Sequence, residues 1–449
     1  WIFPVTYEVK SGESTRSLYG GSSQYQNNIV AALAEGGYYR SVNTINETNF
    51  IVDYDMDWLT EGLSVKGMLS FDYENLHRNN YTKEFATYEL NNRNNPDLYT
   101  SYNQFNADTE MTNSSEFTSI YKLYMEAQVN YARKFGKHDV TAMMLYMQND
   151  YRNKADLAAR YQGMVGRVTY GYDDLFEFNA GYNGSENFMQ GKRFGFFPSF
   201  SAGWRISNEQ FMEGTKDWLN NLKIRASYGS LGNGNVSPYS FLELLSISTS
   251  GRVLNGLKNK YTSAPAVMPD GLTWETATTT DVGLDFGMLN NRLQFNGDYY
   301  IRKTTDMYTV GKTLPDVFGA SSPKGNYADM TTKGWEITLT WRDQFTLAEK
   351  PFNYEIRGTL SDYISTIDRY NNQTGNLNDY YAGKRVGEIW GYVTEGLFKD
   401  QADIDSHADQ TLIQSSSQRV TYPGDVKIKD LNGDHVIDYG NNTLKDHGD

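Results

Sequence analysis

Apolar and polar residues alternate with a period of two along much of the chain. The alternation is clearest in five segments, 63–73, 121–131, 176–183, 222–228 and 335–341. In each segment one set of alternate positions is apolar, and the other carries charged, amide or hydroxyl side chains. This is the period of a β-strand whose two faces meet different surroundings. The pattern therefore predicts a series of amphipathic strands.

The polar face of these strands is charged. Lys223 and Arg225 lie among apolar residues of one strand, and Glu336 lies between two apolar residues of another. A soluble β-sandwich buries its apolar face between two sheets, whereas a large transmembrane barrel turns that face to lipid and wets its lumen. The alternating segment 119–133 is also longer than the about 5 to 6 residues usual in soluble strands. Both features favour a transmembrane antiparallel β-barrel.

The connections between strands fall into two classes. Short polar turns of hairpin chemistry are predicted at 135–138, 173–174 and 290–292. Long polar stretches, each beyond the about 15 residues usual for loops in compact domains, are predicted at 74–116, 230–273, 303–332 and 362–387. Short turns on one side and long loops on the other are the arrangement of outer-membrane barrels.

The same criteria give about 12 to 14 strands, the last of them near 387–397. A polar tail without a terminal aromatic strand follows, and the first residues lack the basic start and apolar stretch of a signal peptide. We therefore expect part of a larger barrel. Residues 1–400 are predicted to form the partial transmembrane barrel, and 401–449 an extracellular loop region.

Composition narrows the class further. The 449 residues include no cysteine, which excludes disulfide scaffolds and thiolate chemistry. Mean hydropathy is −0.63, and no stretch approaches the about 18 apolar residues of a membrane-spanning helix, so a helical membrane protein is excluded. The 35 Tyr, 22 Phe and 8 Trp suit a β-rich protein. A net charge of −14 without a Lys/Arg cluster argues against a nucleic-acid partner.

Distinctive sequences recur in order along the chain. One group comprises 194–199 (FGFFPS), 201–207 (SAGWRIS) and 222–229 (LKIRASYG) running into Gly232 and Asn233. A second group comprises 274–277 (WETA), 281–286 (DVGLDF), 299–307 (YYIRKTTDM) and 326–336, which ends in GWE. In order and approximate spacing, these segments resemble the SusC/RagA family of TonB-dependent outer-membrane transporters. The resemblance covers most of the chain from about Asn28 onward.

The resemblance implies properties that the residues alone do not show. A complete member would have a barrel of about 22 strands, closed by a plug domain and covered by a SusD-like lipoprotein. Energy would come from a TonB–ExbB–ExbD complex through a periplasmic N-terminal region. The cargo would be oligosaccharides or, less readily, peptides, imported across the Gram-negative outer membrane. The plug domain, the TonB-contacting region and the closing strands have no counterpart in this sequence.

Two other functions fit part of the pattern. A siderophore or cobalamin receptor would share the broad fold but differ in cargo and partner. A surface glycan-binding β-protein without transport would not need a charged alternate face, nor short turns that alternate with long loops. The pattern therefore disfavours this second alternative.

One local motif predicts a calcium site. In 430–438 (DLNGDHVID), oxygen-bearing side chains stand at positions one, three, five and nine, as in calcium-binding loops. The predicted Ca2+ ligands in the loop 430–441 are Asp430, Asn432, Asp434, the carbonyl of Val436, Asp438 and Asn441. His435 stands where Gly usually makes the sharp turn, and no Glu stands at position twelve. A polar extracellular turn without metal is the alternative.

Aromatic residues fall into two groups. Those near strand ends, such as Tyr131, Tyr182 and Tyr299, are expected to form girdles at the membrane interfaces. Those on predicted loops are candidates for stacking against sugar rings, or else anchor the loops. These candidate ligand-binding residues are Tyr99, Tyr102, Phe105, Tyr239, Tyr380 and Tyr381.

Catalytic residues are not predicted, and the protein is not expected to be an enzyme. Carboxylate pairs such as Asp53 with Asp55, or Asp285 with Glu336, could suggest glycosidase chemistry. On barrel strands, however, such spacing follows from the alternation and hydrates the lumen. The five histidines do not have the spacing of metal ligands.

Overall fold

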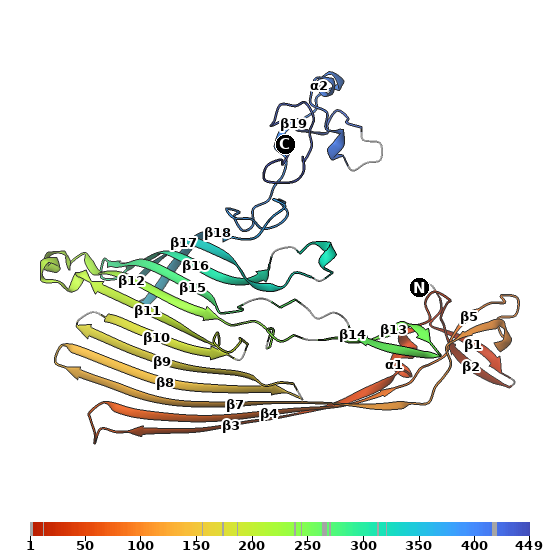
Figure 1. Ribbon diagram of the computed structural model, residues 1–449, viewed down its shortest axis with the longest axis horizontal. Coiled ribbons are helices and arrows are strands. Elements are labelled where there is room, and N and C mark those ends of the chain that lie inside the picture. Colours follow the sequence, from red (N-terminus) through yellow and green to blue (C-terminus); the bar gives the residue numbers. More distant parts are fainter. Residues whose placement is uncertain are drawn as a thin grey trace. The chain divides into compact units, whose positions relative to one another are not determined.

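A computed structural model shows a protein built mainly of long antiparallel strands (Figure 1). It describes residues 3–11, 13–154, 156–172, 175–185, 187–237, 239–243, 245–262, 267–268, 271–311, 314–319, 321–414 and 420–449. Among these residues, none of the helices is both long and apolar enough to cross a membrane.

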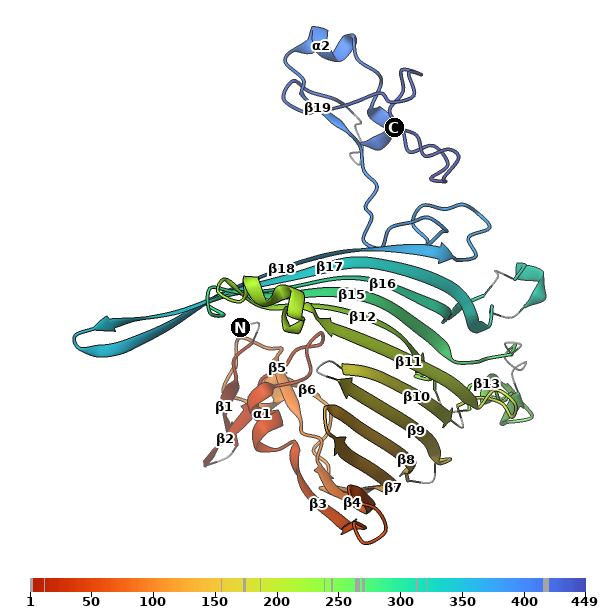
Figure 2. The same ribbon diagram turned by 90° about the vertical axis from the view of Figure 1, so that its left-hand side faces the viewer.

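The main feature is a twelve-stranded sheet with the order β18-β17-β16-β15-β12-β11-β10-β9-β8-β7-β4-β3. Its strands are β3 (Gly37–Asp55), β4 (Leu63–Thr82), β7 (Thr112–Phe135), β8 (His138–Asn153), β9 (Ala159–Tyr172), β10 (Leu175–Ser185), β11 (Phe194–Arg205), β12 (Leu219–Asn233), β15 (Glu275–Met288), β16 (Leu293–Val310), β17 (Lys324–Leu347) and β18 (Lys350–Arg369). The succession follows chain order throughout, as the colours of Figure 2 show. The prediction of an all-β partial barrel with about 12 to 14 strands is confirmed.

Smaller elements lie before, between and after these strands. They are β1 (Thr6–Ser11), β2 (Ser14–Tyr19), α1 (Ile29–Ala34), β5 (Thr87–Leu90), η1 (Tyr99–Ser101), β6 (Tyr102–Phe105), η2 (Ile206–Asn208), η3 (Gln210–Thr215), β13 (Ile247–Leu254), β14 (Leu257–Thr262), η4 (Asp316–Phe318), β19 (Thr394–Leu397), α2 (Gln401–Asp405), η5 (Thr411–Ile413) and β20 (Val426–Ile428). The pairs β1–β2, β5–β6, β13–β14 and β19–β20 each form a separate two-stranded sheet.

The register of the sheet places apolar side chains together on one face. Phe200 lies opposite Tyr228, and Trp204 lies opposite Ile224. These side chains are exposed, Phe200 to 51%, although a soluble protein would bury such a row. The other face of β12 carries Lys223 and Arg225. An exposed apolar face opposite a charged one is what a strand between lipid and a wet lumen requires.

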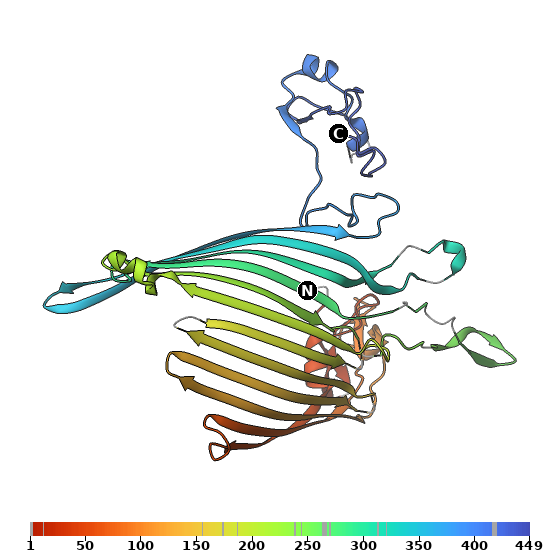
Figure 3. The same ribbon diagram turned by 60° about the vertical axis from the view of Figure 1, so that its left-hand side comes forward.

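The short turns have the backbone conformations that their residues favour. Gly136 joins β7 to β8 with φ +64°, and Asn290 and Asn291 join β15 to β16 with φ +58° and +59°. Glycine and asparagine adopt this left-handed conformation more readily than other residues do. The turn predicted at 173–174 lies outside the described residues. In Figure 3, the β17–β18 turn and the β11–β12 connection lie at the same end of the strands.

The strands extend further into the predicted loops than the sequence indicated. The predicted loop 303–332 contains the end of β16 and the start of β17, and the predicted loop 74–116 contains the end of β4 and the start of β7. These strand ends mix polar residues with scattered apolar ones. Backbone pairing continues there, but the alternation that reveals a strand is lost.

The strand predicted near 387–397 is wrong in most of its length. Only β19 is extended, and it pairs with β20 rather than with the sheet. Gly387 has a φ of +87°, which a regular strand does not contain. Gly396, within β19, has a φ of +129° beside a register shift. The last strand of the sheet therefore ends at Arg369 rather than near residue 400.

The chain divides into two compact units. The first comprises Trp1–Ile51, Met68–Met125 and Asn149–Ala159, and the second comprises Val52–Gly67, Glu126–Gln148 and Arg160–Asp449. The first unit contains a small core of Val9, Leu18, Ala86 and Tyr88. Asn28 supports this unit, because its side chain caps α1 and also donates to the carbonyls of Val5 and Gly20.

The second unit has a core at the end of its strands where the long loops begin. Phe188, Phe197, Leu272 and Trp274 are buried together, and Trp274 donates from Nε1 to the Arg193 carbonyl over 3.2 Å. A Cβ on Gly232 would come within 2.0 Å of the Phe197 ring, so glycine is required there. The family-like segments at 194–199 and 274–277 thus meet in one cluster.

Candidate functional site

An ion-pair network lies on the charged face of the second unit. Arg225 on β12 contacts two carboxylates, with Nε 3.1 Å from Asp285 on β15 and Nη2 2.8 Å from Asp298 on β16. The planar guanidinium suits such paired contacts because its donors form a rigid fork. One side chain therefore joins three neighbouring strands.

Glycine makes this reach possible. Arg225 lies opposite Gly283, and Gly283 lies opposite Asp298. A Cβ on Gly283 would lie 2.6 Å from Arg225 Cζ and 2.5 Å from Asp298 Oδ1. The absence of a side chain on β15 therefore lets Arg225 cross that strand. Glu336 on β17 lies opposite Asp298 and continues the charged row.

A second cluster closes the loop end of the last three strands. Arg369 contacts Asp329 at 2.6 Å and Asp306 at 2.9 Å. Asp306 has φ +57° beside a register shift in β16, and Asn326 Nδ2 donates to its carbonyl. Asn326 also bonds with the backbone of Thr273 in both directions. The cluster thus fixes the point at which the chain leaves the sheet for 370–449.

The predicted calcium loop folds as a series of tight turns. Asp430 accepts from the backbone N–H groups of Gly433 (2.6 Å) and His435 (3.0 Å), which hold its pKa below the usual range although burial opposes this shift. Asn432 and Asp434 accept from the backbone in the same way. His435 has φ +66°, the conformation that Gly usually supplies.

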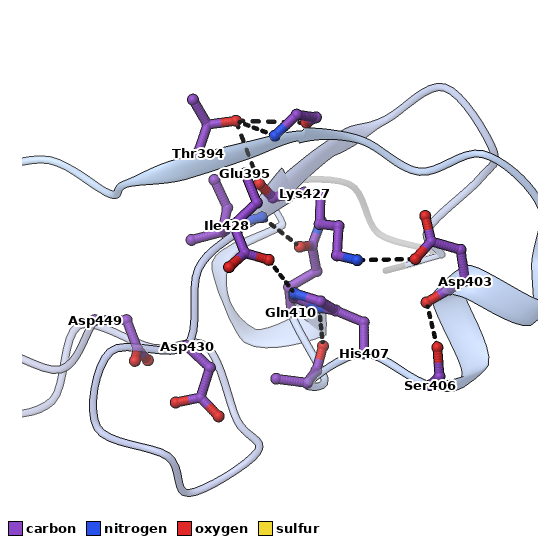
Figure 4. A network of polar contacts seen from close by, with 12 residues as sticks. Thr394, Glu395, Asp403, Ser406, His407, Gln410, Lys427, Ile428, Asp430 and Asp449 are labelled. Atoms are coloured by element: carbon purple, nitrogen blue, oxygen red, sulfur yellow. Dashed lines mark hydrogen bonds and ion pairs between the residues drawn. The ribbon is translucent and has the colours of Figure 1, made fainter.

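The carboxylates among the predicted calcium ligands are not placed as a metal-binding group. Within the described part of the chain, no group of three or more His, Cys, Asp or Glu side chains is placed to hold a metal. Asn441 bonds with Asp446 instead. Asp449, which the sequence did not single out, accepts from Leu431 and Asp438 and ties the loop together. Figure 4 shows Asp430 and Asp449 beside the β19–β20 pair. Calcium binding stays a prediction.

Calorimetry on the purified full-length protein tests it. If the loop binds calcium, we expect a Kd of about 10⁻⁴ to 10⁻³ M, the range of extracellular calcium modules. Asp434→Ala should abolish the heat signal, because it removes a charged ligand. Asp405→Ala, on the exposed α2 helix nearby, should leave it unchanged. The absence of a signal from the unsubstituted protein at 10-fold higher calcium, about 10⁻² M, would rule the site out.

Three predicted ligand aromatics lie together in the first unit. Tyr99 forms hydroxyl contacts with Tyr88 and Gln104, and Arg16 lies over its ring. Tyr102 packs on Tyr7 and donates to the Pro96 carbonyl. Burial, together with Tyr99, raises the pKa of Tyr88 to about 12. Tyr102 therefore helps to hold the first unit together, and Phe105 is the last residue of strand β6. Ligand contact by Tyr99 stays a prediction.

The other three predicted aromatics lie in the second unit. Tyr239 has φ +61° and its ring lies 6.2 Å from that of Phe241. Tyr380 is half-exposed, with its ring edge against Tyr370. Tyr381 is buried and donates to Glu388 over 2.6 Å, while Trp390 Nε1 donates to its hydroxyl. Tyr381 thus anchors the loop, which leaves Tyr380 as the accessible member of the pair.

The contact with Tyr381 predicts a pH dependence. This hydrogen bond lowers the pKa of Glu388 below its usual value. A depressed carboxyl pKa stabilises the fold above the unfolded pKa, and that contribution is lost as the pH falls through the folded pKa. In protein labelled with 5-fluorotryptophan, the Trp390 resonance should therefore titrate below about pH 4.3, the ordinary Glu value. In Glu388→Gln, the Trp390 resonance should not change with pH in this range. In Tyr381→Phe, the midpoint of its titration should move to higher pH. An unchanged midpoint in Tyr381→Phe would contradict the assignment.

The carboxylate pairs do not form an acid–base site. Asp285 is engaged by Arg225 and also accepts from Asn296. It lies opposite Asn296, whereas Glu336 lies opposite Asp298. Asp53 and Asp55 are exposed on β3. These carboxylates therefore belong to the hydrated face of the sheet.

Sequence reasoning missed the partnership of Arg225 with Gly283 and Asp298. The charged face of β12 was visible in the alternation. The pairing, however, depends on the register that brings together Arg225 and Gly283, 58 residues apart, and Gly283 and Asp298, 15 residues apart. A glycine within an otherwise regular strand was the available signal. It indicates the close approach of another group.

Fold and site together define the class of protein. Strands with an exposed apolar face and a charged opposite face, joined by short turns at one end and long loops at the other, form the wall of an outer-membrane β-barrel. The family described as TonB dependent receptor-like, beta-barrel, matches residues 5–440. The chain belongs to this family and is located in the outer membrane.

Individual relatives agree with the assignment. The chain is 26% identical over 431 residues to TonB-dependent receptor P3 of Formosa agariphila, covering 85% of this chain and 41% of the receptor. It is 29% identical over 227 residues to TonB-dependent receptor SusC of Bacteroides thetaiotaomicron, covering 49% and 22%. Its fold is similar to the RagAB peptide transporter, with a TM-score of 0.61 at 18% identity over 80% of this chain and 40% of that one. The chain thus spans less than half the length of these relatives, and its resemblance to the SusC/RagA type is confirmed.

Proposed function

We propose that the complete protein imports oligomeric nutrients across the outer membrane. Oligosaccharides are the favoured cargo and peptides the alternative. A SusD-like surface lipoprotein would be the partner, and the TonB–ExbB–ExbD complex would supply energy through the periplasmic region that precedes the barrel in the family. The observation that carries this proposal is the combination of family membership with sequence likeness to SusC over 49% of the chain.

The geometry of the sheet is compatible with polar cargo. The row of Arg225, Asp285, Asp298 and Glu336 gives the inner face fixed charges and hydrogen-bonding groups of both kinds. Such a face stays hydrated and does not hold apolar solutes. The peptide cargo named for the RagAB transporter keeps peptides in consideration.

Gene deletion in the source bacterium tests the proposal. We expect the deletion strain to lose growth on one class of oligosaccharide or peptide while it keeps growth on the corresponding monomers. Affinity purification of the full-length protein should recover a surface lipoprotein in equal amount. An uncoupler of the proton gradient should stop uptake of a labelled oligomer. A growth defect that appears only under iron or cobalamin limitation, without a lipoprotein partner, would instead establish the siderophore or cobalamin receptor.

A further inference from the structure

A compact lobe, residues 394–449, follows β18 at the end of the sheet where the long loops lie. Its core is formed by three buried side chains, those of Ala408, Ile428 and Ile437. Segment 408–410 links two parts of the lobe. The N–H of Asp409 donates to the His435 carbonyl over 2.9 Å, and the N–H of Ile437 donates to the Asp409 carbonyl over 2.8 Å. A contact that holds segment 408–410 in place therefore also steadies the loop 430–438.

His407 lies directly before this segment. Only 8% of its side chain is exposed, and its ring lies edge-on to that of Phe398, with 5.2 Å between the ring centroids. Its Nδ1 lies 2.9 Å from the carbonyl oxygen of Ala408. A carbonyl oxygen can only accept, so Nδ1 carries the proton of the neutral ring and donates in this bond. Nε2 of the neutral ring is therefore an acceptor.

The Nε2 atom of His407 faces a carboxylate. It lies 4.0 Å from Oε2 of Glu395 on β19, as Figure 4 shows. Neither atom has a proton to donate while the ring is neutral, and their separation is longer than a hydrogen bond. Protonation of the ring places a donor and a positive charge opposite Glu395. The contact then joins β19 to segment 408–410.

The charged groups of the neighbouring elements have other partners. Lys427 of β20 forms an ion pair of 2.8 Å with Asp403 of α2. In the loop that follows β20, the carboxylates of Asp430 and Asp449 accept hydrogen bonds from backbone N–H groups. The carboxylate on β19 is thus the one that can respond to a charge on His407.

We propose that His407 and Glu395 form a pH-sensitive clasp within the lobe. When the His407 ring is protonated, Nε2 donates to Glu395 and holds β19 against segment 408–410, and through that segment the loop 430–438. An imidazole ordinarily gains its charge as the pH falls from about 8 to about 5. The clasp therefore forms as the pH falls and is lost as the pH rises. The lobe is more rigid in mildly acidic surroundings than in neutral ones.

Hydrogen exchange of the full-length protein in detergent, followed by mass spectrometry in calcium-free buffer, tests the proposal. Rates are compared at about pH 5.5 and about pH 7.5, on either side of the ordinary imidazole value, and corrected for the intrinsic effect of pH. We expect the Asp409 and Ile437 amides to exchange about two- to fivefold more slowly at the lower pH, the effect of a partly exposed ion pair. In His407→Gln and in Glu395→Gln this difference should disappear.

Three matched variants control for other groups of the lobe. His435→Asn and His447→Gln replace its other two histidines, and asparagine tolerates the left-handed conformation of position 435. Asp405→Asn removes an exposed carboxylate from α2. All three variants should keep the difference between the two pH values.

The proposal is overturned if the unsubstituted protein exchanges equally at both pH values, or if Glu395→Gln keeps the difference. It is also overturned if His435→Asn or His447→Gln abolishes the difference while His407→Gln keeps it. The Glu395 side chain is 42% exposed, so its substitution leaves the lobe folded. Glu395→Gln therefore decides the outcome even if His407→Gln loosens the lobe at both pH values. Uptake of nutrients does not enter this experiment, so a negative result leaves the proposed transport function unchanged.

Discussion

Trp274→Ala is expected to lower the free energy of unfolding by about 3 to 5 kcal/mol, the range for removing a large buried aromatic side chain. Only 6% of the Trp274 surface is exposed, and its ring lies 5.0 Å from that of Phe188 and 5.6 Å from that of Phe197. The substitution opens a cavity where the connection 234–274 meets β11. It also removes the donor to the Arg193 carbonyl. Denaturant unfolding of the full-length protein in lipid vesicles, followed by fluorescence, measures the loss.

The companion variants separate packing from hydrogen bonding. Trp274→Phe keeps one aromatic ring in the cluster but loses the Nε1 donor and the volume of the second ring, so it should lower the free energy of unfolding by about 1 to 2 kcal/mol, less than Trp274→Ala. Trp58→Ala, in the exposed turn between β3 and β4, should stay within about 0.5 kcal/mol of the unsubstituted protein. Trp274→Ala should also expose the 234–274 connection to protease. Equal losses in Trp58→Ala and Trp274→Ala would contradict the assigned role of this cluster.

Part of this fold could be predicted because lipid imposes a strict pattern on a strand. Residues 222–228 show the full alternation, and they form the centre of β12 as expected. The alternation of apolar and polar residues is lost where a strand no longer faces lipid. Strand β16 continues to Val310 through TTDMYTV, in which no apolar face is visible. Segment 387–397 keeps apolar residues at intervals, but Gly387 has a positive φ, and only 394–397 forms a strand, which pairs with β20 rather than with the sheet.

Candidate sites were less predictable, because they depend on contacts between distant segments. Loop position made Tyr381 a candidate ligand residue, but in the structure it is buried and hydrogen-bonded to Glu388 and Trp390. The oxygen spacing of 430–438 predicts a calcium loop, and calcium binding there stays a prediction. The role of Asp449, 18 residues from Leu431, could not be read from that spacing. Local sequence thus indicates which groups are available, and tertiary pairing decides what they contact.

Arg225→Ala is expected to lower the free energy of unfolding by about 1 to 2 kcal/mol, because it leaves two partly buried carboxylates without their cation. The side chains of Arg225, Asp285 and Asp298 are exposed to 33%, 17% and 23%, so solvent screens them in part. In the same variant, the free energy of unfolding should depend less on salt concentration than it does in the unsubstituted protein. The measurement is again unfolding in vesicles.

Gly283→Val provides an independent test of the same network. The valine side chain would occupy the space through which Arg225 reaches Asp298. Gly283→Val should therefore lower the free energy of unfolding by about as much as Arg225→Ala does. If both substitutions act on one contact, the double variant should cost no more than either single one. Gly358→Val, where a Cβ meets no atom within 4 Å, controls for the intrinsic effect of valine in a strand. Additive losses in the double variant would mean that Gly283 serves packing rather than the passage of Arg225. A shared loss would establish that a glycine on β15 is what joins β12 to β16.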